Sequence, residues 1–285
     1  MVFMKKTTKD DYCRSVNKVT EYIEKNYAAD LTLDTLSRIS GFSKYHFHRI
    51  FLAVTGESLN AFVRRVRLSK STGKLANDLS VTEVAMQSGY ETPAAFARAF
   101  KEQYGLSPKA FAKNIKEQKG DAMIDARIID FEPVEVLYVR KRGDYEVSAG
   151  EAFEVLFGFA YAQKIKYHKN LLGKETRVFG IGHDDPNMTA PEDLRYDACI
   201  SYDDQSVKPE GEVGIKTIEG GRHLSFLHKG PYEELKKVYS DLMAYIIEHG
   251  ITMADRPPFE RYLNRDPGRT KPENLKTEIY IPIEA

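Results

Sequence analysis

The chain has 285 residues, 29% of them charged, and no apolar run of the ~18 residues that a membrane span needs. Its lysine-rich start lacks the apolar segment of a secretory signal, and its two cysteines, Cys13 and Cys199, fit a reducing compartment and are too few for a cysteine-built zinc site. We therefore expect a cytoplasmic protein of two ordinary domains, with no membrane partner, metal or cofactor.

Charge divides the chain into two parts. Residues 1–120 contain 20 Lys and Arg against 12 Asp and Glu, a net charge of +8, and residues 121–285 contain 22 against 30, a net charge of −8. A basic half joined to an acidic half indicates an anion-binding module beside a module of another kind. A chance imbalance of solvated faces would give the same count, so the motifs must decide.

The first half contains an internal repeat. The sequence Phe-His-Arg-Ile-Phe at 47–51 recurs 49 residues later as Phe-Ala-Arg-Ala-Phe at 96–100, and Gly41-Phe42 recurs as Gly89-Tyr90. A repeated pattern of this length indicates one supersecondary unit used twice.

Each repeat is predicted to form a helix, a tight turn and a second helix. Glycine at position 41 or 89 suits the left-handed conformation of the turn. The expected N-caps are Thr32 and Ser43 in the first unit, and Ser80 (with Glu83 at capping-box spacing) and Thr92 (followed by Pro93) in the second. Residues 58–77 are predicted to form one long basic helix that fixes the distance between the units.

Two short amphipathic helices joined by a glycine turn are typical of the helix-turn-helix motif, whose second helix enters the major groove. The alternative is a helical bundle that binds protein. Gly89-Tyr90, the Phe-x-Arg-x-Phe-Lys run at 96–101, and Gly105 with Ser107-Pro108 resemble the signature of the AraC/XylS family over residues 10–118. That resemblance implies a promoter-binding regulator, with RNA polymerase as a possible further partner.

By the same resemblance, both second helices read double-stranded DNA. The residues expected to face DNA are Lys44, Tyr45, His48 and Arg49 in the first unit and Thr92, Pro93, Ala94, Ala97 and Arg98 in the second. Arg49 is suited to guanine, whereas the second helix is small and apolar apart from Arg98. We therefore expect the first helix to supply most of the sequence discrimination. The arginines of the helix between the units are expected to contact phosphate, or alternatively only to solvate its surface.

The second half repeats a different unit. Gly143-x-Tyr145-Glu146 recurs as Gly230-x-Tyr232-Glu233, and the Asp-Pro-x-x-Thr-x-Pro run at 185–191 recurs at 266–272. Strand-like residues at 131–139 and 224–228 precede helical stretches near 149–166 and 232–248, and alternating strands follow at 196–202 and 276–283. Each copy is therefore predicted as βαββ, and two copies should pack about a pseudo-twofold axis with a cleft between them.

These paired elements resemble the GyrI-like effector-binding domain. The predicted organisation is multidomain: an all-α DNA-binding domain with two helix-turn-helix motifs at 1–118, a linker at 119–123, and an α+β effector-binding domain of two βαββ repeats at 124–285. The family often places a glutamate in an aromatic pocket that meets a cationic lipophilic ligand.

Glu260 stands at the position that matches this glutamate. On a strand it shares a face with Tyr262, and a buried carboxylate needs a partner such as a ligand cation. The alternative is pairing with Arg261 or Arg265. The expected ligand-binding residues are Glu260, Tyr262, Tyr145, Tyr232 and Tyr280.

The sequence thus predicts a DNA-binding transcription regulator, an activator in our interpretation, that responds to a small-molecule effector. Two alternatives fuse the DNA-binding domain to a GyrI-like hydrolase or to a ligand-sequestering domain. Hydrolases of this family use a pocket that includes tryptophan, and this chain has none. It also lacks a nucleophile elbow, a His-Glu-x-x-His motif and a phosphate loop, so we expect no catalytic residues and no enzymatic activity.

Overall fold

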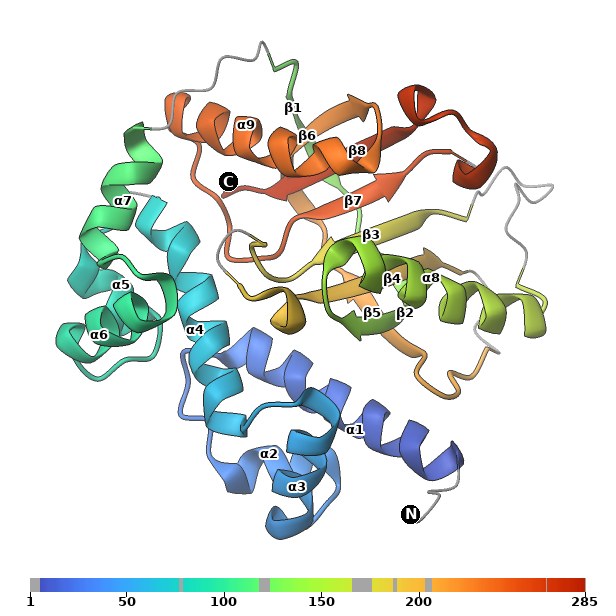
Figure 1. Ribbon diagram of the computed structural model, residues 1–285, viewed down its shortest axis with the longest axis horizontal. Helices are drawn as coiled ribbons and strands as arrows, with labels where there is room; N and C mark the ends of the chain where they lie inside the picture. The colour runs from blue at the N-terminus through green and yellow to red at the C-terminus, as the bar shows by residue number, and fades with distance from the viewer. Residues whose placement is uncertain are drawn as a thin grey trace. The chain divides into compact units, whose positions relative to one another are not determined.

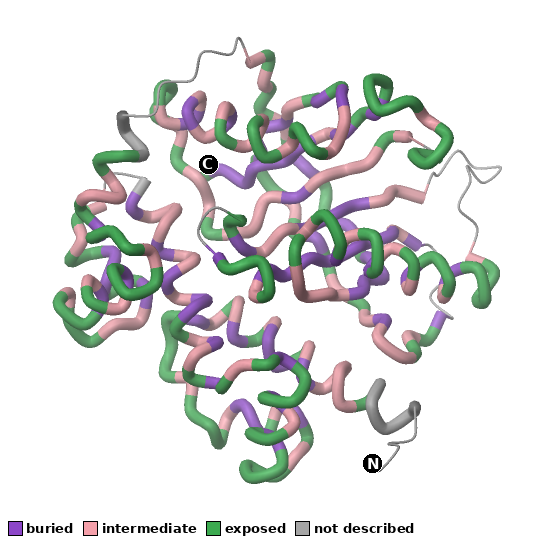
Figure 2. The backbone as a smooth tube through the Cα atoms, in the orientation of Figure 1, coloured by how far each residue is buried: buried purple, intermediate pink, exposed green. Residues whose placement is uncertain are grey.

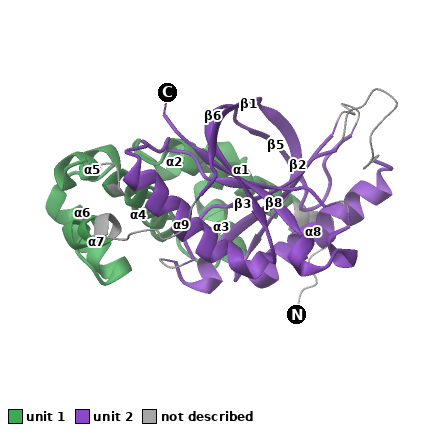
Figure 3. Cartoon of the chain, turned by 90° about the horizontal axis from the view of Figure 1, so that it is seen from above, with its two compact units in different colours: residues 1–117 green, residues 118–285 purple. Residues whose placement is uncertain are grey.

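The computed structural model describes residues 6–76, 79–117, 124–165, 176–186, 189–202, 207–264 and 266–284. The chain forms two compact units, residues 1–117 and 118–285, which Figure 3 shows in different colours. Among the described residues, no helix combines the length and the apolar character needed to cross a membrane.

Unit 1 is entirely helical. Its helices are α1 (Lys6–Asn26), α2 (Leu33–Ser40), α3 (Lys44–Thr55), α4 (Leu59–Ala76), α5 (Val81–Gln87), α6 (Pro93–Tyr104) and α7 (Pro108–Glu117). The pairs α2–α3 and α5–α6 are the two predicted helix-turn-helix motifs, and α4 runs between them (Figure 1).

The ends of these helices are set by the residues that the sequence indicated. The Thr32 hydroxyl accepts a hydrogen bond from the Thr35 amide at 3.2 Å, and Gly41 ends α2 with φ of 76°. Ser80 and Glu83 form both hydrogen bonds of a capping box. The side chain of Thr92 caps α6. The predicted capping pattern is therefore confirmed.

Helix α4 belongs to two separate hydrophobic cores. Its first half contributes Phe62 and Val66 to a core with α1, α2 and α3. Its second half contributes Leu68 and Leu75 to a core with α5, α6 and α7. The two helix-turn-helix motifs therefore have their own cores and share one helix.

Unit 2 is built on one eight-stranded antiparallel sheet. Its helices are α8 (Tyr145–Ala162) and α9 (Leu235–Glu248), and its strands are β1 (Arg127–Phe131), β2 (Val134–Arg142), β3 (Val178–Gly182), β4 (Arg195–Ser201), β5 (Gly214–Ile218), β6 (Gly221–Lys229), β7 (Phe259–Tyr262) and β8 (Lys276–Pro282). The strand order is β1-β6-β8-β7-β3-β4-β2-β5. The copies β2-α8-β3-β4 and β6-α9-β7-β8 are the two predicted βαββ repeats, and β3 pairs with β7 at the centre.

Each copy has an additional leading strand, which the sequence prediction missed. Pro133 lies between β1 and β2, so the strand predicted at 131–139 corresponds to β2, with Phe131 belonging to the separate strand β1. Strand β1 precedes β2 but pairs with β6, whereas β5 precedes β6 but pairs with β2. The two copies therefore exchange their first strands, and these strands, β1 and β5, stand at the two ends of the order.

The two faces of the sheet have different surroundings. Helices α8 and α9 both lie over one face, where α8 packs on β2 and β4 and α9 packs on β6 and β8 (Figure 1). The opposite face carries a core that includes Phe131, Phe179, Phe259 and Tyr280. Buried residues consequently concentrate along the strands (Figure 2).

Candidate DNA-binding and ligand-binding sites

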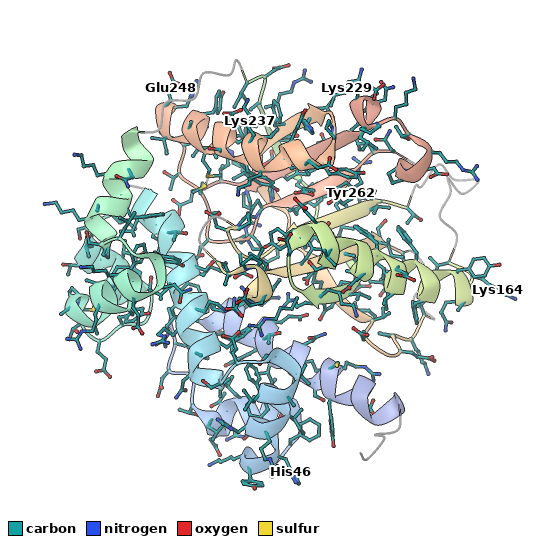
Figure 4. All side chains as sticks on the ribbon, in the orientation of Figure 1. His46, Lys164, Lys229, Lys237, Glu248 and Tyr262 are labelled. Carbon is teal, nitrogen blue, oxygen red and sulfur yellow. The ribbon has the colours of Figure 1, made fainter. Side chains whose placement is uncertain are left out.

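The first recognition helix, α3, presents a polar and aromatic surface. Lys44, Tyr45, His48 and Arg49 are all exposed, and Tyr45 keeps 70% of its accessible surface. The Tyr45 hydroxyl accepts a hydrogen bond from Arg49 Nη1 at 3.1 Å, and the Arg49 guanidinium carbon lies 5.6 Å from the ring centroid. Tyr45 therefore orients the guanidinium along the outer face of α3. His46, on the same helix, is labelled in Figure 4.

Lys44 has a partner within its own motif. Its Nζ lies 2.7 Å from Asp34 on α2, and Arg38 contacts the same carboxylate at 2.6 Å. These pairs are exposed, and pairs of this kind contribute at most about 1 kcal/mol. The pair with Asp34 therefore holds Lys44 only weakly.

The second recognition helix, α6, presents a smaller surface. Thr92, Ala94 and Arg98 are exposed, and Pro93 and Ala97 are partly buried. The Thr92 hydroxyl accepts from the Ala95 amide at 3.1 Å, so this side chain is already used as a cap. Arg98 is the one cation among the five residues that the sequence assigned to this helix.

Two arginines of α4 have contacts other than those that the sequence predicted. The Arg65 side chain is buried and forms an ion pair with Glu57 at 2.6 Å. Arg67 donates to the backbone carbonyls of Tyr27 and Ala29. The expectation that these arginines contact phosphate is therefore wrong for Arg65 and unsupported for Arg67, because both guanidinium groups bind protein acceptors.

In unit 2, Glu260 lies on the helix-covered face of the sheet, surrounded by tyrosines. Its carboxylate accepts hydrogen bonds from the hydroxyls of Tyr262 and Tyr239. Burial raises the pKa of Glu260, and the two tyrosine hydrogen bonds offset part of that rise. Burial next to this carboxyl also raises the pKa of Tyr239 and Tyr262 well above the usual value.

A chain of hydroxyls continues from Glu260 toward α8. The hydroxyl oxygens of Tyr196 and Tyr262 are 2.7 Å apart, and since Tyr262 donates to Glu260, Tyr196 donates to Tyr262. Gly180 lies directly opposite Glu260 in the β3–β7 pair. A Cβ atom at Gly180 would overlap the Tyr196 hydroxyl and lie 2.6 Å from the Tyr262 hydroxyl, so both phenols occupy space that only glycine leaves open.

Further rings pack around these phenols. Phe153 of α8 lies 5.7 Å from the Tyr262 ring, and Tyr232 lies 5.5 Å from the same ring on another side. The Tyr145 ring lies 5.8 Å from Tyr196, and the Tyr145 hydroxyl donates to the Asp184 carbonyl at 2.7 Å. The group formed by Glu260 with Tyr145, Phe153, Tyr196, Tyr232, Tyr239 and Tyr262, which we name the Glu260 cluster, is thus an acid enclosed by aromatic rings; Tyr262 is labelled in Figure 4.

Tyr280 does not belong to this cluster. It lies on the opposite face of the sheet, stacked on Phe259 at 4.8 Å between ring centroids, and its hydroxyl donates to Glu278. The prediction that Tyr280 contacts the same ligand as Glu260 is therefore corrected, because neighbouring strands fix which residues of β8 face the helices.

The ion pairs of the described residues offer no cation to Glu260. Arg261 points to the other face and lies 3.7 Å from Glu278. Arg265, the other predicted partner, lies outside the described residues. Charge on Glu260 is therefore opposed by burial and supported only by neutral hydroxyls within the described part of unit 2.

The fully buried carboxylate of Asp197 has very different surroundings from that of Glu260. It lies on the opposite face of β4, where Arg140 donates to it at 2.6 and 2.9 Å, His183 Nε2 lies 2.8 Å from its carboxylate, and Lys216 forms a further ion pair. Although burial opposes ionisation, these cations hold the pKa of Asp197 well below its usual value. By contrast, the half-buried Glu260 has only uncharged groups among its described contacts.

The sequence analysis missed Gly180, Tyr196, Tyr239 and Phe153. Tyr196 was part of a predicted alternating strand, and Tyr239 and Phe153 were part of predicted helices, but no local pattern indicates which of their faces meets β7. The Asp-Pro runs of the two repeats lie 81 residues apart, and this offset matches Glu260 with Phe179, which lies on the opposite face of the sheet. In the paired strands, the residue across from Glu260 is instead Gly180. Only the sheet register reveals this neighbour.

Two helix-turn-helix motifs in series, each with an exposed second helix, define a DNA-binding unit, and comparison with known proteins agrees. Residues 36–114 match the family described as a helix-turn-helix domain. Residues 125–284 match the GyrI-like small molecule binding domain. The chain belongs to the GyrI-like family, with a helix-turn-helix DNA-binding domain of the AraC type before the GyrI-like domain.

Curated relatives share both parts. The transcriptional regulator Rob of Salmonella typhimurium is 22% identical over 282 residues, which cover 92% of this chain and 95% of that protein. The right origin-binding protein of Escherichia coli K12 shows the same identity and coverage. A cryo-EM structure of an EcmrR–DNA complex is 16% identical, with a TM-score of 0.49 over 88% of this chain and 98% of EcmrR. This chain is a DNA-binding transcriptional regulator with a C-terminal GyrI-like domain.

Proposed function

We propose that this regulator activates transcription in response to a lipophilic cation bound at the Glu260 cluster. One observation carries the proposal: the half-buried carboxylate of Glu260 accepts hydrogen bonds from two tyrosines, while the described ion pairs give it no cation. A ligand cation would supply the missing charge, and the faces of the surrounding rings would add cation–π attraction of about 0.5–2 kcal/mol each.

The hydrogen bonds around Glu260 suggest how ligand binding could change the structure of unit 2. The hydroxyls of Tyr262 and Tyr239 both donate to the Glu260 carboxylate, so a ligand that contacts this carboxylate also meets these two tyrosines. Because Tyr262 belongs to β7 and Tyr239 to α9, movement of these tyrosines on ligand binding would displace β7 and α9. Direct contact of the DNA-bound regulator with RNA polymerase is part of the same proposal and rests on the resemblance to AraC-type activators.

For DNA reading, we propose that α3 dominates discrimination between sequences. Arg49 is oriented by Tyr45 and suits a guanine edge, a contact worth about 1–3 kcal/mol. The face of α6 offers Arg98 and the methyl groups of Ala94 and Ala97. These methyl groups suit apolar contact with thymine methyls, and apart from Arg98 the face can make few hydrogen bonds to bases. Removing Arg49 should therefore relax specificity more than removing Arg98.

The ligand proposal is tested with a lipophilic quaternary ammonium ion and its uncharged carbon isostere. Titration calorimetry on the full chain should detect the cation and not the isostere, and Glu260→Gln should weaken cation binding at least tenfold, about 1.4 kcal/mol. Run-off transcription from a bound promoter should rise with the cation only when Glu260 is intact. Equal binding of cation and isostere, or full binding by Glu260→Gln, would refute the assignment.

The DNA proposal is tested on a duplex selected from a random pool by the full chain. Each base pair of the two half-sites is then substituted in turn. For the wild-type chain, the affinity losses should concentrate in one half-site. Arg49→Ala should bind with an affinity that no longer depends on the base pairs of that same half-site. Equal dependence on both half-sites would contradict the proposal.

A further inference from the structure

The two helix-turn-helix motifs are connected by more than the shared helix. Arg67 lies near the middle of α4, between Val66 of the first core and Leu68 of the second. Its side chain reaches the segment that follows α1. Arg67 Nε donates to the Tyr27 carbonyl at 2.8 Å, and Nη2 donates to the Ala29 carbonyl at 3.0 Å.

One of these acceptor residues, Tyr27, belongs to the first core, and the other, Ala29, is exposed. Tyr27 follows α1 directly and is buried with Ile23 of that helix. Both carbonyls lie in the turn after α1 ends at Asn26, and the partial negative charge near the end of a helix makes a guanidinium a favourable partner there. Arg67 therefore fastens α4 to the end of α1.

The turn of the second motif meets the same guanidinium. Gly89 has φ of 76°, and a Cβ atom there would lie 2.9 Å from both Cζ and Nε of Arg67 and 3.0 Å from the Ala28 carbonyl oxygen. The turn thus approaches the end of α1 as closely as a glycine allows. The guanidinium of Arg67 lies between the two, which brings parts of both motifs into one contact.

Lys74, two turns further along α4, repeats this bridge. Its Nζ donates to the Gln87 carbonyl at 2.9 Å and lies 5.2 Å from the centroid of the Tyr27 ring. One cation therefore joins the end of α5 to the same tyrosine whose carbonyl Arg67 binds. Tyr27 is a common point for both bridges.

We propose that Arg67, packed against Gly89, is a positioning residue that fixes α6 relative to α3 and thereby sets the half-site spacing that the regulator accepts. The inference rests on the proposed function in which both helices enter the major groove. Adding one base pair moves the second half-site by about 3.4 Å and roughly a tenth of a turn. A braced pair of motifs cannot follow that displacement, whereas a pair joined only by α4 can follow part of it.

The test compares the selected duplex with versions that have one base pair inserted or deleted between the half-sites. The readout is the spacing penalty, the ratio of the dissociation constants for the altered and the original duplex, measured by fluorescence anisotropy. For the wild-type chain we expect a penalty of about 30-fold or more, comparable with the loss of one or two base contacts. Arg67→Ala should bind the original duplex more weakly and reduce the penalty to about 5-fold or less.

Arg64→Ala is the matched control. Arg64 is on the same helix, is exposed, and lies 3.8 Å from Glu102. This variant removes the same charge and should keep the wild-type spacing penalty. Arg67→Lys retains the charge and cannot make both hydrogen bonds, so its penalty should fall between those of the wild type and Arg67→Ala; it also serves if Arg67→Ala fails to fold by circular dichroism.

Three outcomes would overturn the inference. If Arg67→Ala weakens binding equally on all duplexes and lowers the salt dependence by about one phosphate contact, Arg67 binds DNA directly. If the spacing penalty of Arg67→Ala equals that of the wild type, the brace does not set the spacing. If the wild-type chain shows no spacing penalty, reading by two helices is itself refuted, and this result is recognised without any variant.

Discussion

Replacing Glu260 by glutamine should stabilise the protein at neutral pH while removing the proposed ligand site. Burial raises the pKa of Glu260, so the folded state binds this proton more tightly than the unfolded state does. Stability from this group is therefore fully present below the unfolded pKa of about 4.5 and declines as the pH rises through the higher folded pKa. Glutamine resembles the protonated carboxyl and does not titrate.

The size of the effect follows from the displacement of the pKa. Each pKa unit between the folded and unfolded states is about 1.4 kcal/mol, and each kcal/mol moves the melting temperature of a domain of this size by about 2–4 °C. The difference between Glu260→Gln and the wild type should be near zero at about pH 4.5 and grow toward a plateau at alkaline pH. Thermal unfolding followed by circular dichroism between those limits measures it.

The control is Glu278→Gln, on the opposite face of the sheet. That carboxylate lies 3.7 Å from Arg261 and accepts hydrogen bonds from Tyr280 at 2.5 Å and Ser225 at 3.2 Å. Its replacement breaks an ion pair and should lower stability at neutral pH. If Glu260→Gln is instead less stable than the wild type at pH 8, a positive charge supports the Glu260 carboxylate in the free protein and the argument for a ligand cation fails.

Three further variants test the surroundings of the site by the same thermal measurement. Gly180→Ala should lose about 1–3 kcal/mol because its Cβ would overlap the Tyr196 hydroxyl, whereas Gly150→Ala, with open space on α8, should be neutral or stabilising. Asp197→Asn should lose about 3–5 kcal/mol at pH 7, and the difference should shrink below about pH 3.8, since the pKa of Asp197 is lowered by its buried cations. Burial lowers the pKa of His223, so the wild type should lose stability as the pH falls below about 6.5. His223→Phe should not show that loss. If the variant loses stability in parallel with the wild type, His223 is not the source of the loss.

The helical half was predictable because its signals are local. A cap such as Ser80 with Glu83 acts within one helical turn, so the sequence alone places the start of α5. The roles of Arg65 and Arg67 were not predictable in this way. Their acceptors, Glu57 and the carbonyls after α1, are defined by tertiary packing, and a run of basic residues looks the same whether it faces DNA or protein.

The sheet was predictable in its repeated units and not in its pairing. The exchange of β1 and β5 between the copies joins residues nearly 100 positions apart, as in the pair of Ile128 with Leu224, and no local pattern indicates it. Alternation places Glu260 and Tyr262 on one face, and it leaves open which residues of the neighbouring strands share that face. This is why Tyr280 was misplaced and Tyr196 was missed.

The two repeats of unit 2 are alike at their ends and different at the axis between them. Gly143 and Gly230 both have positive φ at the turn before the helix, with values of 133° and 156°. At the axis, however, Glu260 of one copy faces Gly180 of the other. An exact twofold pair would set two acids or two glycines there, giving either repulsion between carboxylates or no charge at all. Only the unequal pair provides one carboxylate together with the space for the phenols that surround it. A singly charged ligand therefore requires the two copies to differ at the axis. Substitutions that make positions 180 and 260 alike should abolish the proposed response.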